Sequence, residues 1–338
     1  MEKFEFPKIE LHLHLDGALL PETMWALAKE KGVALPTETP EQFRDWIVKT
    51  SDCESVPAYL ERFELPLQLL QDKASLERVT YELICTLISQ GHIYDEIRFA
   101  PQLHKRAGMT QRDAIDAVLS GRAKALAEHP DYGCGIILCA MSFGREDMNE
   151  QENLETVRLT KAYLGTGVVA CDLAGCEGVV PMHNFYRIFD LARELGVPFT
   201  CHAEAPDNAD SVRDVFGFGG RRIGHGHKLY DAPDLWQRAR ELGVTLEICP
   251  TSNIQCKTQP SYEQHPAKKL FDAGIRVTIN TDNMTLAATT LDREYELCLT
   301  RMGFEKRDLV QMNIYAAEAA FMDDAQRQPI IEKLKAYL

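Results

Sequence analysis

The chain has 338 residues, of which 45% are hydrophobic, a composition typical of a globular protein. Its formal net charge is −14, from 37 basic and 51 acidic residues, and the sequence has no basic cluster of the kind that nucleic-acid binding needs. No apolar run reaches the roughly 18 residues of a membrane span, and residues 1–5 lack the apolar core of a signal peptide. We therefore expect a cytoplasmic protein that binds a small molecule and has no nucleic-acid or membrane partner.

Residues 9–17 alternate apolar and polar side chains, which predicts a β-strand. Side chains two apart on a strand point to the same side, so His12 and His14 present two imidazoles together, followed by Asp16 and the turn residue Gly17. Neutral imidazole is a common ligand of divalent metals. A His-x-His pair alone is also typical of two surface histidines on an edge strand, so a metal site needs further ligands from the rest of the chain.

The next segments have helical spacing. Residues 21–30 begin with a proline and predict a helix, whereas residues 36–40 predict a loop. Residues 56–70 carry apolar side chains at helical intervals, with a break expected at Pro66. We interpret this second stretch either as core packing or as an apolar wall beside a functional site.

From residue 93 onward, short apolar runs that predict strands alternate with amphipathic segments that predict helices. The predicted strands are residues 93–101, 133–141, 168–175, 197–202, 222–226, 244–250 and 275–282, and the helices between them include residues 111–128, 184–195, 232–242 and 266–273. With residues 9–17 this makes eight strands, which favours a parallel sheet covered on both faces.

Eight such units fit one (β/α)8 TIM barrel domain over residues 1–338, of the α/β class, with additional helices after the first strand. A doubly wound open sheet is the alternative. It usually needs fewer strands, and its glycine-rich phosphate loop is not apparent after the first strand.

In a (β/α)8 barrel the active site lies at the carboxyl ends of the strands. Five of the ten histidines fall at these predicted ends: His12, His14, His202, His225 and His227. With Asp282, the first three form a mixed nitrogen and oxygen set suited to one zinc ion per chain. Such a metal lowers the pKa of its water toward neutrality and so makes hydroxide available.

Other polar residues at the strand ends have different predicted roles. Glu204 lies just past a predicted ligand, where it is placed to act as a general acid or base. His225 is placed to orient or stabilise the hydroxide. We expect His227 and His265 to be structural.

These residues together resemble the adenosine deaminase family of the amidohydrolase superfamily, and the resemblance covers nearly the whole chain. It implies a zinc-dependent (β/α)8 hydrolase of purine metabolism that converts adenosine, and with it 2′-deoxyadenosine, to inosine-type products and ammonia. The six motifs that carry it are HLHLDGA at residues 12–18, DLAG at 172–175, CHAE at 201–204, IGHG at 223–226, CPTSN at 249–253 and NTDN at 280–283.

The resemblance also implies a role for each matching residue. The zinc ligands would be His12, His14, His202 and Asp282. Glu204 would protonate the purine ring nitrogen next to the attacked carbon, and His225 with Asp282 would orient and deprotonate the water. The substrate would contact Asp16 through a ribose hydroxyl and the Gly175 N–H through a ring nitrogen; the other expected substrate contacts are His14, Leu60, Phe63, Met141 and Asn283.

The chain departs from the family pattern at two positions. The family usually reads His-Ala-Gly-Glu, whereas here Glu204 follows His202 by two residues and Ala205 stands at the third position. The better-known members carry two aspartates at the end of strand eight, where this chain has Asp282 followed by Asn283. An asparagine amide donates a hydrogen bond without needing a raised pKa, so this second change is compatible with purine binding.

Three other interpretations of the sequence remain open. The first is a deaminase of a related aminopurine such as adenine, against which Asp16 argues because a free base has no ribose. The second is a cytidine-deaminase-type zinc site, which would need a Pro-Cys-x-x-Cys motif that the sequence lacks. The third is a binding protein on a deaminase scaffold with impaired catalysis, supported by the shifted position of Glu204.

Overall fold

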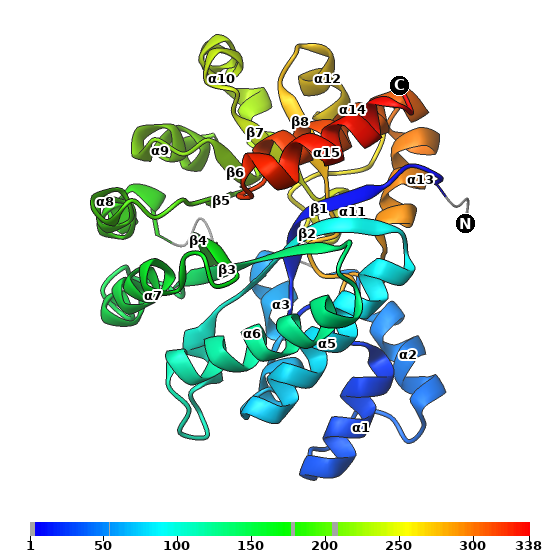
Figure 1. Cartoon of the computed structure of the whole chain (residues 1–338), viewed down its shortest axis with the longest axis vertical. Helices are drawn as coiled ribbons and strands as arrows, with labels where there is room; N and C mark the ends of the chain where they lie inside the picture. Colours follow the sequence, from blue (N-terminus) through cyan, green and yellow to red (C-terminus); the bar gives the residue numbers. More distant parts are fainter. Residues whose placement is uncertain (1–3, 54, 177–179, 205–208) are drawn as a thin grey trace.

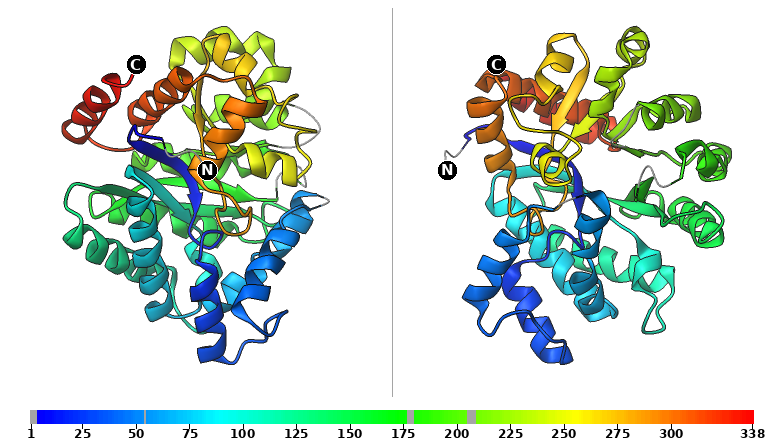
Figure 2. Two further views of the ribbon diagram at one scale, coloured as in Figure 1. Left: turned by 90° about the vertical axis from the view of Figure 1, so that its right-hand side faces the viewer. Right: turned by 180° about the vertical axis from the view of Figure 1, so that it is seen from behind.

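The computed structural model describes residues 4–53, 55–176, 180–204 and 209–338. Parallel strands lie at its centre, and helices surround them (Figures 1 and 2). Ala205 lies outside the described residues. Among the helices that are described, none is both long enough and apolar enough to cross a membrane.

The strands form two four-stranded parallel sheets, which we call the first and the second half-barrel. In each sheet the strands lie side by side in chain order. The first half-barrel consists of β1 (Lys8–His14), β2 (His92–Phe99), β3 (Gly133–Ser142) and β4 (Val168–Gly175). The second consists of β5 (His202–Ala203), β6 (Arg222–His225), β7 (Thr245–Ile248) and β8 (Arg276–Ile279).

Two parallel bridges join the half-barrels. Leu13 of β1 pairs with Asp282, which follows β8, and Cys171 of β4 pairs with Phe199, which precedes β5. At the first bridge the Asp282 N–H donates to His12 O at 2.9 Å. These bridges complete a ring of eight strands among the described residues, so the predicted (β/α)8 fold is confirmed.

The predicted strand over residues 197–202 is shorter in the structure. The ladder of β5 contains only His202 and Ala203, and the preceding segment contributes the single bridge at Phe199. Pro198 has no N–H to donate to a sheet, so the pairing with β4 does not extend back beyond the bridge at Phe199.

Helices that precede β2 form the additional layer expected after the first strand, in the lower part of Figure 1. They are α1 (Pro21–Lys31), α2 (Pro40–Lys49), α3 (Val56–Glu61), α4 (Glu64–Leu69) and α5 (Lys73–Ser89). The break within residues 56–70 falls at Arg62 and Phe63, so its predicted position at Pro66 was wrong. Pro66 lies in the first turn of α4. Backbone N–H groups in a first turn have no carbonyl partner within the helix, so a proline there costs no hydrogen bond.

The remaining α-helices follow β2 in the chain. They are α6 (Gln111–Glu128), α7 (Glu150–Tyr163), α8 (Tyr186–Leu195), α9 (Asp210–Phe218), α10 (Trp236–Leu242), α11 (Pro250–Gln255), α12 (Ala267–Asp272), α13 (Leu291–Arg301), α14 (Lys306–Ala319) and α15 (Asp324–Lys335). The short 3-10 helices within the described residues are η1 (Pro101–His104), η2 (Met182–Phe185), η3 (His227–Asp231) and η4 (Pro233–Leu235).

The interior of the barrel holds several buried charged side chains. Arg98 of β2 lies 2.9 Å from Asp172 and 2.7 Å from Glu247, and Arg222 of β6 lies 2.7 Å from Glu247 and also contacts Glu96. Charges are tolerated at such depth only when they are paired. This network lies directly behind the carboxyl ends of the strands and supports the residues there.

Candidate active site

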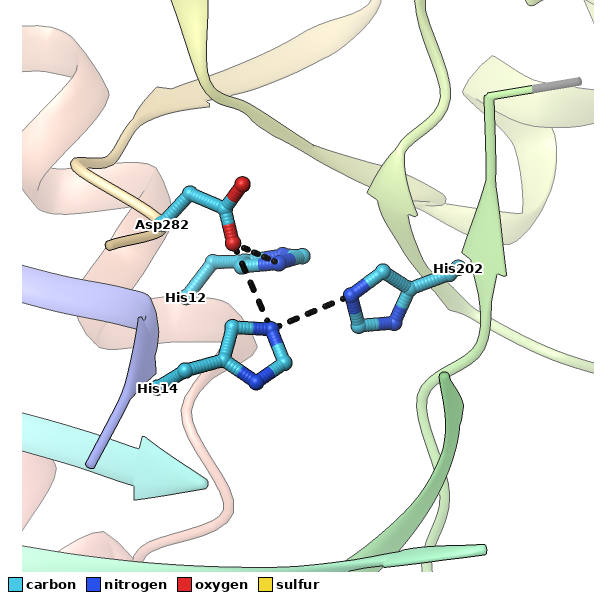
Figure 3. Close-up of side chains that lie close together, drawn as sticks. All are labelled: His12, His14, His202 and Asp282. Carbon is cyan, nitrogen blue, oxygen red and sulfur yellow. Dashed lines mark hydrogen bonds and ion pairs between the residues drawn. The ribbon is translucent and has the colours of Figure 1, made fainter. Parts of the chain in front are cut away.

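Four residues predicted to bind metal come together at the carboxyl ends of the strands (Figure 3). His12 and His14 lie on β1, His202 begins β5, and Asp282 follows β8. His14 Nε2 is 3.2 Å from His202 Nε2 and 3.3 Å from Asp282 Oδ1. One ligand atom from each of the four residues lies within 4.8 Å of the others. The bridge between β1 and the segment after β8 is what brings residues from the two ends of the chain to one place.

Two buried carboxylates orient two of these histidines. Glu247 Oε2 lies 2.9 Å from His12 Nδ1, and Asp172 Oδ2 lies 3.0 Å from His202 Nδ1. Because a carboxylate accepts a hydrogen bond from a protonated ring nitrogen, His12 keeps its Nε2 lone pair for the centre of the cluster. The contact of Asp172 with His202 Nδ1 favours the same tautomer in His202. Arg98 contacts both carboxylates and so ties the two supports together.

Burial and neighbouring charges set the protonation states in the cluster. Burial opposes ionisation of Glu247, but Arg222 and Arg98 outweigh it and hold the pKa of Glu247 well below its ordinary value. Burial lowers the pKa of His14 well below its ordinary value despite the nearby carboxylate of Asp282, so this imidazole is neutral. Neutral imidazole and ionised carboxylate are the forms that bind a metal.

The donor set fits a divalent metal ion. His12 Nε2 is buried without a hydrogen bond, and Asp282 Oδ1 lies 3.5 Å from it. Since the His12 proton is held on Nδ1 by Glu247, His12 Nε2 and Asp282 Oδ1 both present lone pairs to each other. A cation between these two atoms would stabilise the arrangement. Three imidazoles and one carboxylate are ligands that zinc takes in proteins.

Glu204 and His225 lie side by side next to the cluster. His225 ends β6 with φ of 55°, a left-handed conformation that is uncommon for residues other than glycine. Its Nε2 is 3.3 Å from Glu204 Oε1. The Glu204 side chain is buried and lines the cavity described below, although it follows His202 by two residues rather than three.

Two residues of α11 contact the predicted catalytic groups, and the sequence analysis assigned them no role. Asn253 Nδ2 is 3.0 Å from Glu204 Oε2 and 3.0 Å from His225 Nδ1. The Ser252 hydroxyl donates to Asp282 Oδ2 at 2.6 Å. Both belong to the CPTSN motif after β7, and their place at a strand end was the signal that could have identified them.

A cavity of about 390 Å³ opens beside the cluster, within the roughly 300–1,000 Å³ usual for small-molecule sites. Tyr59, one of the apolar residues of the stretch 56–70 that we interpreted as core packing or as a wall beside a site, is buried in its lining. The lining includes every residue that the sequence analysis expected to contact the substrate: His14, Asp16, Leu60, Phe63, Met141, Gly175 and Asn283.

Asp16 gives this cavity a polar wall. Its Oδ1 is buried and has no hydrogen-bond partner. Burial, with repulsion from Asp282, raises the pKa of Asp16 to about 7. An unsatisfied buried acceptor is costly by itself, so this oxygen is suited to receive a hydrogen bond from a ligand.

The rim of the cavity carries one arginine or lysine among the described lining residues. This is Arg106, whose Nη1 and Nη2 lie 2.6 and 2.9 Å from the two carboxylate oxygens of Glu64. Its charge is already balanced by a two-point contact. The lining therefore suits a neutral ligand better than an anionic one.

Comparison with known proteins gives the family. The sequence model of the family described as Adenosine deaminase matches residues 7–337. The chain belongs to the adenosine deaminase family. One relative, an adenosine deaminase of Haemophilus ducreyi, is 37% identical over 334 residues, which cover 98% of this chain and 96% of the relative. Another, from Clostridium perfringens, is 36% identical over 336 residues, which cover 99% and 98% of the two chains.

Solved structures agree with this family. An N6-mAMP deaminase of Arabidopsis has a TM-score of 0.84 at 26% identity and 98% coverage of both chains. An amidohydrolase of Burkholderia ambifaria with bound zinc has a TM-score of 0.84 at 25% identity, with 98% of this chain and 92% of that chain covered. An adenine deaminase of Arthrobacter aurescens, with a TM-score of 0.88 at 22% identity and 98% coverage of both chains, shares the fold. As a member of this family, the chain is a metal-dependent hydrolytic deaminase.

Proposed function

We propose that the protein deaminates adenosine and 2′-deoxyadenosine to the corresponding inosines and ammonia, with one zinc ion held by His12, His14, His202 and Asp282. The observation that carries the proposal is the position of these four ligands beside a largely apolar cavity whose wall contains Glu204 and Asp16. The relatives named adenosine deaminase, at 36 and 37% identity, support the choice of substrate.

Zinc in this site would lower the pKa of a water molecule and so supply hydroxide at neutral pH. The Ser252 hydroxyl donates to Asp282 Oδ2, and Asp282 Oδ1 is the oxygen that faces the histidines of the cluster. We assign Asp282 and His225 to orienting the attacking water and taking its proton. Both side chains lie on the second half-barrel, beside Glu204.

Glu204 is assigned as the proton donor to the purine ring. Attack on the carbon that bears the amine drives negative charge into the ring, and a proton delivered to the adjacent nitrogen neutralises it. A positioned acid of this kind typically contributes about 100- to 10,000-fold. Glu204 is buried in the cavity wall and bonded to Asn253, so its carboxyl group is held in one orientation.

The purine and the sugar would be recognised by different parts of the lining. Gly175 has φ of 116°, and an added Cβ would lie 2.5 Å from Ser142 O, so the backbone at this position requires glycine. Its backbone N–H would donate to a ring nitrogen. Asn283 would donate its amide to the imidazole nitrogen, and Asp16 would accept from a ribose hydroxyl. The apolar side chains of Leu60, Phe63 and Met141 would enclose the base.

Two alternative substrates fit the cavity less well. Adenine lacks the sugar and would leave the buried Asp16 oxygen without a partner. A 5′-nucleotide would bring its phosphate to a rim where Arg106 is already paired with Glu64. The arrangement therefore favours a neutral nucleoside.

The test uses purified, zinc-loaded protein with adenosine, 2′-deoxyadenosine, adenine and AMP, and it follows the ultraviolet change on loss of the amine. We expect the two nucleosides to have the highest kcat/KM. Elemental analysis should find about one zinc per chain, with activity lost to a chelator and restored by zinc. Equal turnover of adenine would reject the nucleoside assignment. Binding of zinc and adenosine without turnover would support the binding-protein alternative.

A further inference from the structure

A chain of hydrogen bonds runs through the protein to Glu204 from the side away from the cavity. The Ala267 N–H donates to His265 Nδ1 at 3.2 Å, and His265 Nε2 lies 3.2 Å from Asn253 Oδ1. Asn253 Nδ2 then lies 3.0 Å from both Glu204 Oε2 and His225 Nδ1. Asn253 is fully buried and is not among the described residues that line the cavity.

The backbone N–H at the start of this chain fixes the direction of the first bonds. A backbone N–H can only donate, so His265 Nδ1 must accept. Burial lowers the pKa of His265 to about 3, so the ring is neutral and carries its one proton on Nε2. That proton is donated to Asn253 Oδ1. Because His265 occupies the amide oxygen, the two hydrogens of Asn253 Nδ2 point toward Glu204 and His225.

The opposite orientation of the Asn253 amide is excluded by the same contacts. It would turn Nδ2 toward the donating nitrogen of His265 and Oδ1 toward the Glu204 carboxylate, so both contacts would become repulsive. Two backbone N–H groups, from Thr258 and Gln259, each donate to Asn253 O at 3.0 Å and hold the residue in place.

The amide therefore acts on two side chains at once. At Glu204 it donates to Oε2, and a carboxyl oxygen that accepts from an amide N–H is the less favourable place for the acidic proton, so the transferable proton is directed to Oε1. At His225 the amide N–H is donated to Nδ1, which must accept and so carries no proton, and the ring proton lies on Nε2. His225 Nε2 then faces Glu204 Oε1, at 3.3 Å, as a donor.

We propose that Asn253, oriented by His265, is a positioning residue that selects the proton-carrying oxygen of Glu204 and the Nε2–H tautomer of His225. In this tautomer His225 Nε2 has no lone pair. His225 therefore cannot accept the proton of the attacking water, so the O–H bond of that water is broken by proton transfer to the Asp282 carboxylate, the other group assigned to it. This inference rests on the proposed function, in which Glu204 and His225 act on the substrate.

The first test is Asn253→Asp, which keeps the shape of the side chain and replaces its donor with an acceptor. We expect kcat for adenosine to fall about 100-fold, the scale of a misplaced acid, while KM changes less than about threefold because Asn253 does not line the cavity. Histidine 15N spectra of the zinc-loaded protein give a readout independent of turnover. His225 should carry its proton on Nε2 in the unmodified protein and on Nδ1 in Asn253→Asp.

The second test is a pair of variants at His265. In His265→Gln the amide nitrogen takes the place of Nε2 and can still donate to Asn253 Oδ1, so kcat should stay within about threefold. His265→Phe keeps a ring but removes the donor, and kcat should fall at least about 10-fold. The matched control is Asn313→Asp, because Asn313 is a buried asparagine on α14 that bonds Ile9 N and Tyr295 Oη far from the cavity. It should lower stability and leave kcat unchanged.

The proposal is overturned if folded Asn253→Asp keeps kcat within about threefold and leaves the His225 proton on Nε2. Should Asn253→Asp fail to fold, equal kcat values for His265→Gln and His265→Phe overturn it instead. If the unmodified protein does not deaminate adenosine, the proposed function fails by itself. The His225 tautomer in the unmodified protein and in Asn253→Asp then decides the positioning role separately.

Discussion

The two half-barrels differ in how they are held together. The strands of the first have 7, 8, 10 and 8 residues, whereas those of the second have 2, 4, 4 and 4. In the second half the chain leaves the sheet early, with left-handed backbone conformations at His225 and Asp282, and α11 begins two residues after β7. The first half-barrel is therefore held together mainly by backbone hydrogen bonds between its strands, whereas the second relies more on side-chain contacts.

The same comparison separates structural from chemical roles. The first half-barrel contributes two predicted metal ligands and much of the cavity wall, while Glu204, His225, Asn253 and Asp282 all belong to the second. Short ladders let side chains reach the centre from loops and helix starts, where hydrogen bonds such as that of Asn253 to Glu204 hold them. Catalytic loops on a rigid scaffold follow the same principle.

The largest expected effect tests the second half-barrel, which carries the predicted catalytic side chains. Glu204→Gln keeps the size of the side chain and removes the acid, so turnover of adenosine should fall about 100- to 10,000-fold, with zinc still bound by elemental analysis. Glu241→Gln, at an exposed position on α10 of the same half, is the control and should leave turnover unchanged. Near-normal turnover of Glu204→Gln would place the acid elsewhere. The next carboxylate along the chain is Asp207, which lies outside the described residues, and Asp207→Asn would be the next variant.

The second effect tests the contacts that cross between the halves. His12 belongs to the first half and is oriented by Glu247 of the second, whereas His202 belongs to the second and is oriented by Asp172 of the first. Glu247→Gln and Asp172→Asn should each weaken zinc binding about 10- to 100-fold. Competition with a chelator of known affinity measures this.

The control for that pair is another buried histidine–carboxylate contact. Asp95 Oδ1 lies 2.7 Å from His92 Nδ1 on β2, far along the chain from the predicted ligands. Asp95→Asn should cost stability and leave zinc affinity unchanged. If all three variants weaken zinc binding equally, the loss reflects general loosening of the barrel and the orienting role is rejected.

The third effect tests the polar wall that the first half contributes to the cavity. Asp16→Ala should reduce the preference for adenosine over adenine about 10- to 100-fold, the value of a hydrogen bond to a charged group, about 1.5–3 kcal/mol. Asp16→Asn keeps an acceptor oxygen and should retain more of the preference. The ratio of kcat/KM for the two substrates measures it, and an unchanged ratio in Asp16→Ala would remove Asp16 from sugar recognition.

The smallest effect concerns the stability of the second half. Glu294 of α13 accepts from the Thr251 N–H at 3.1 Å and so supports the start of α11; burial raises its pKa to about 7. The folded state therefore binds this proton more tightly than the unfolded state, whose pKa is about 4.3. The resulting stabilisation is fully present below about pH 4.3 and is lost as the pH rises through 7.

Glu294→Gln removes that titration. The free energy of unfolding of the unmodified protein relative to this variant should fall by about 1 kcal/mol between pH 6 and 7. Urea titrations at several pH values measure the difference. Glu296→Gln, on the same helix, is the control and should give a difference independent of pH in this range. A flat difference for Glu294→Gln would show that Glu294 is ionised throughout.

Local patterns in the sequence determined much of this protein. Alternation along residues 9–17 predicted that His12 and His14 share a face, and β1 has that form. Apolar runs separated by amphipathic segments predicted the eight strands, and α6 and β4 have the predicted bounds. The motifs at the strand ends named residues that line the cavity in the structure. These features could be predicted from the sequence because side-chain direction in a strand or helix depends on near neighbours in the chain.

Only the tertiary structure decided which side chains support the site. His12 meets Glu247, 235 residues away, and Glu204 meets Asn253, 49 residues away, because barrel closure and strand register bring them together. The sequence predicts a structural role for His265, whereas the structure places this side chain behind Asn253, where it contacts Asn253 Oδ1. Periodicity reports the face on which a side chain lies, but the partner across a barrel depends on how the strands are staggered and where each one ends.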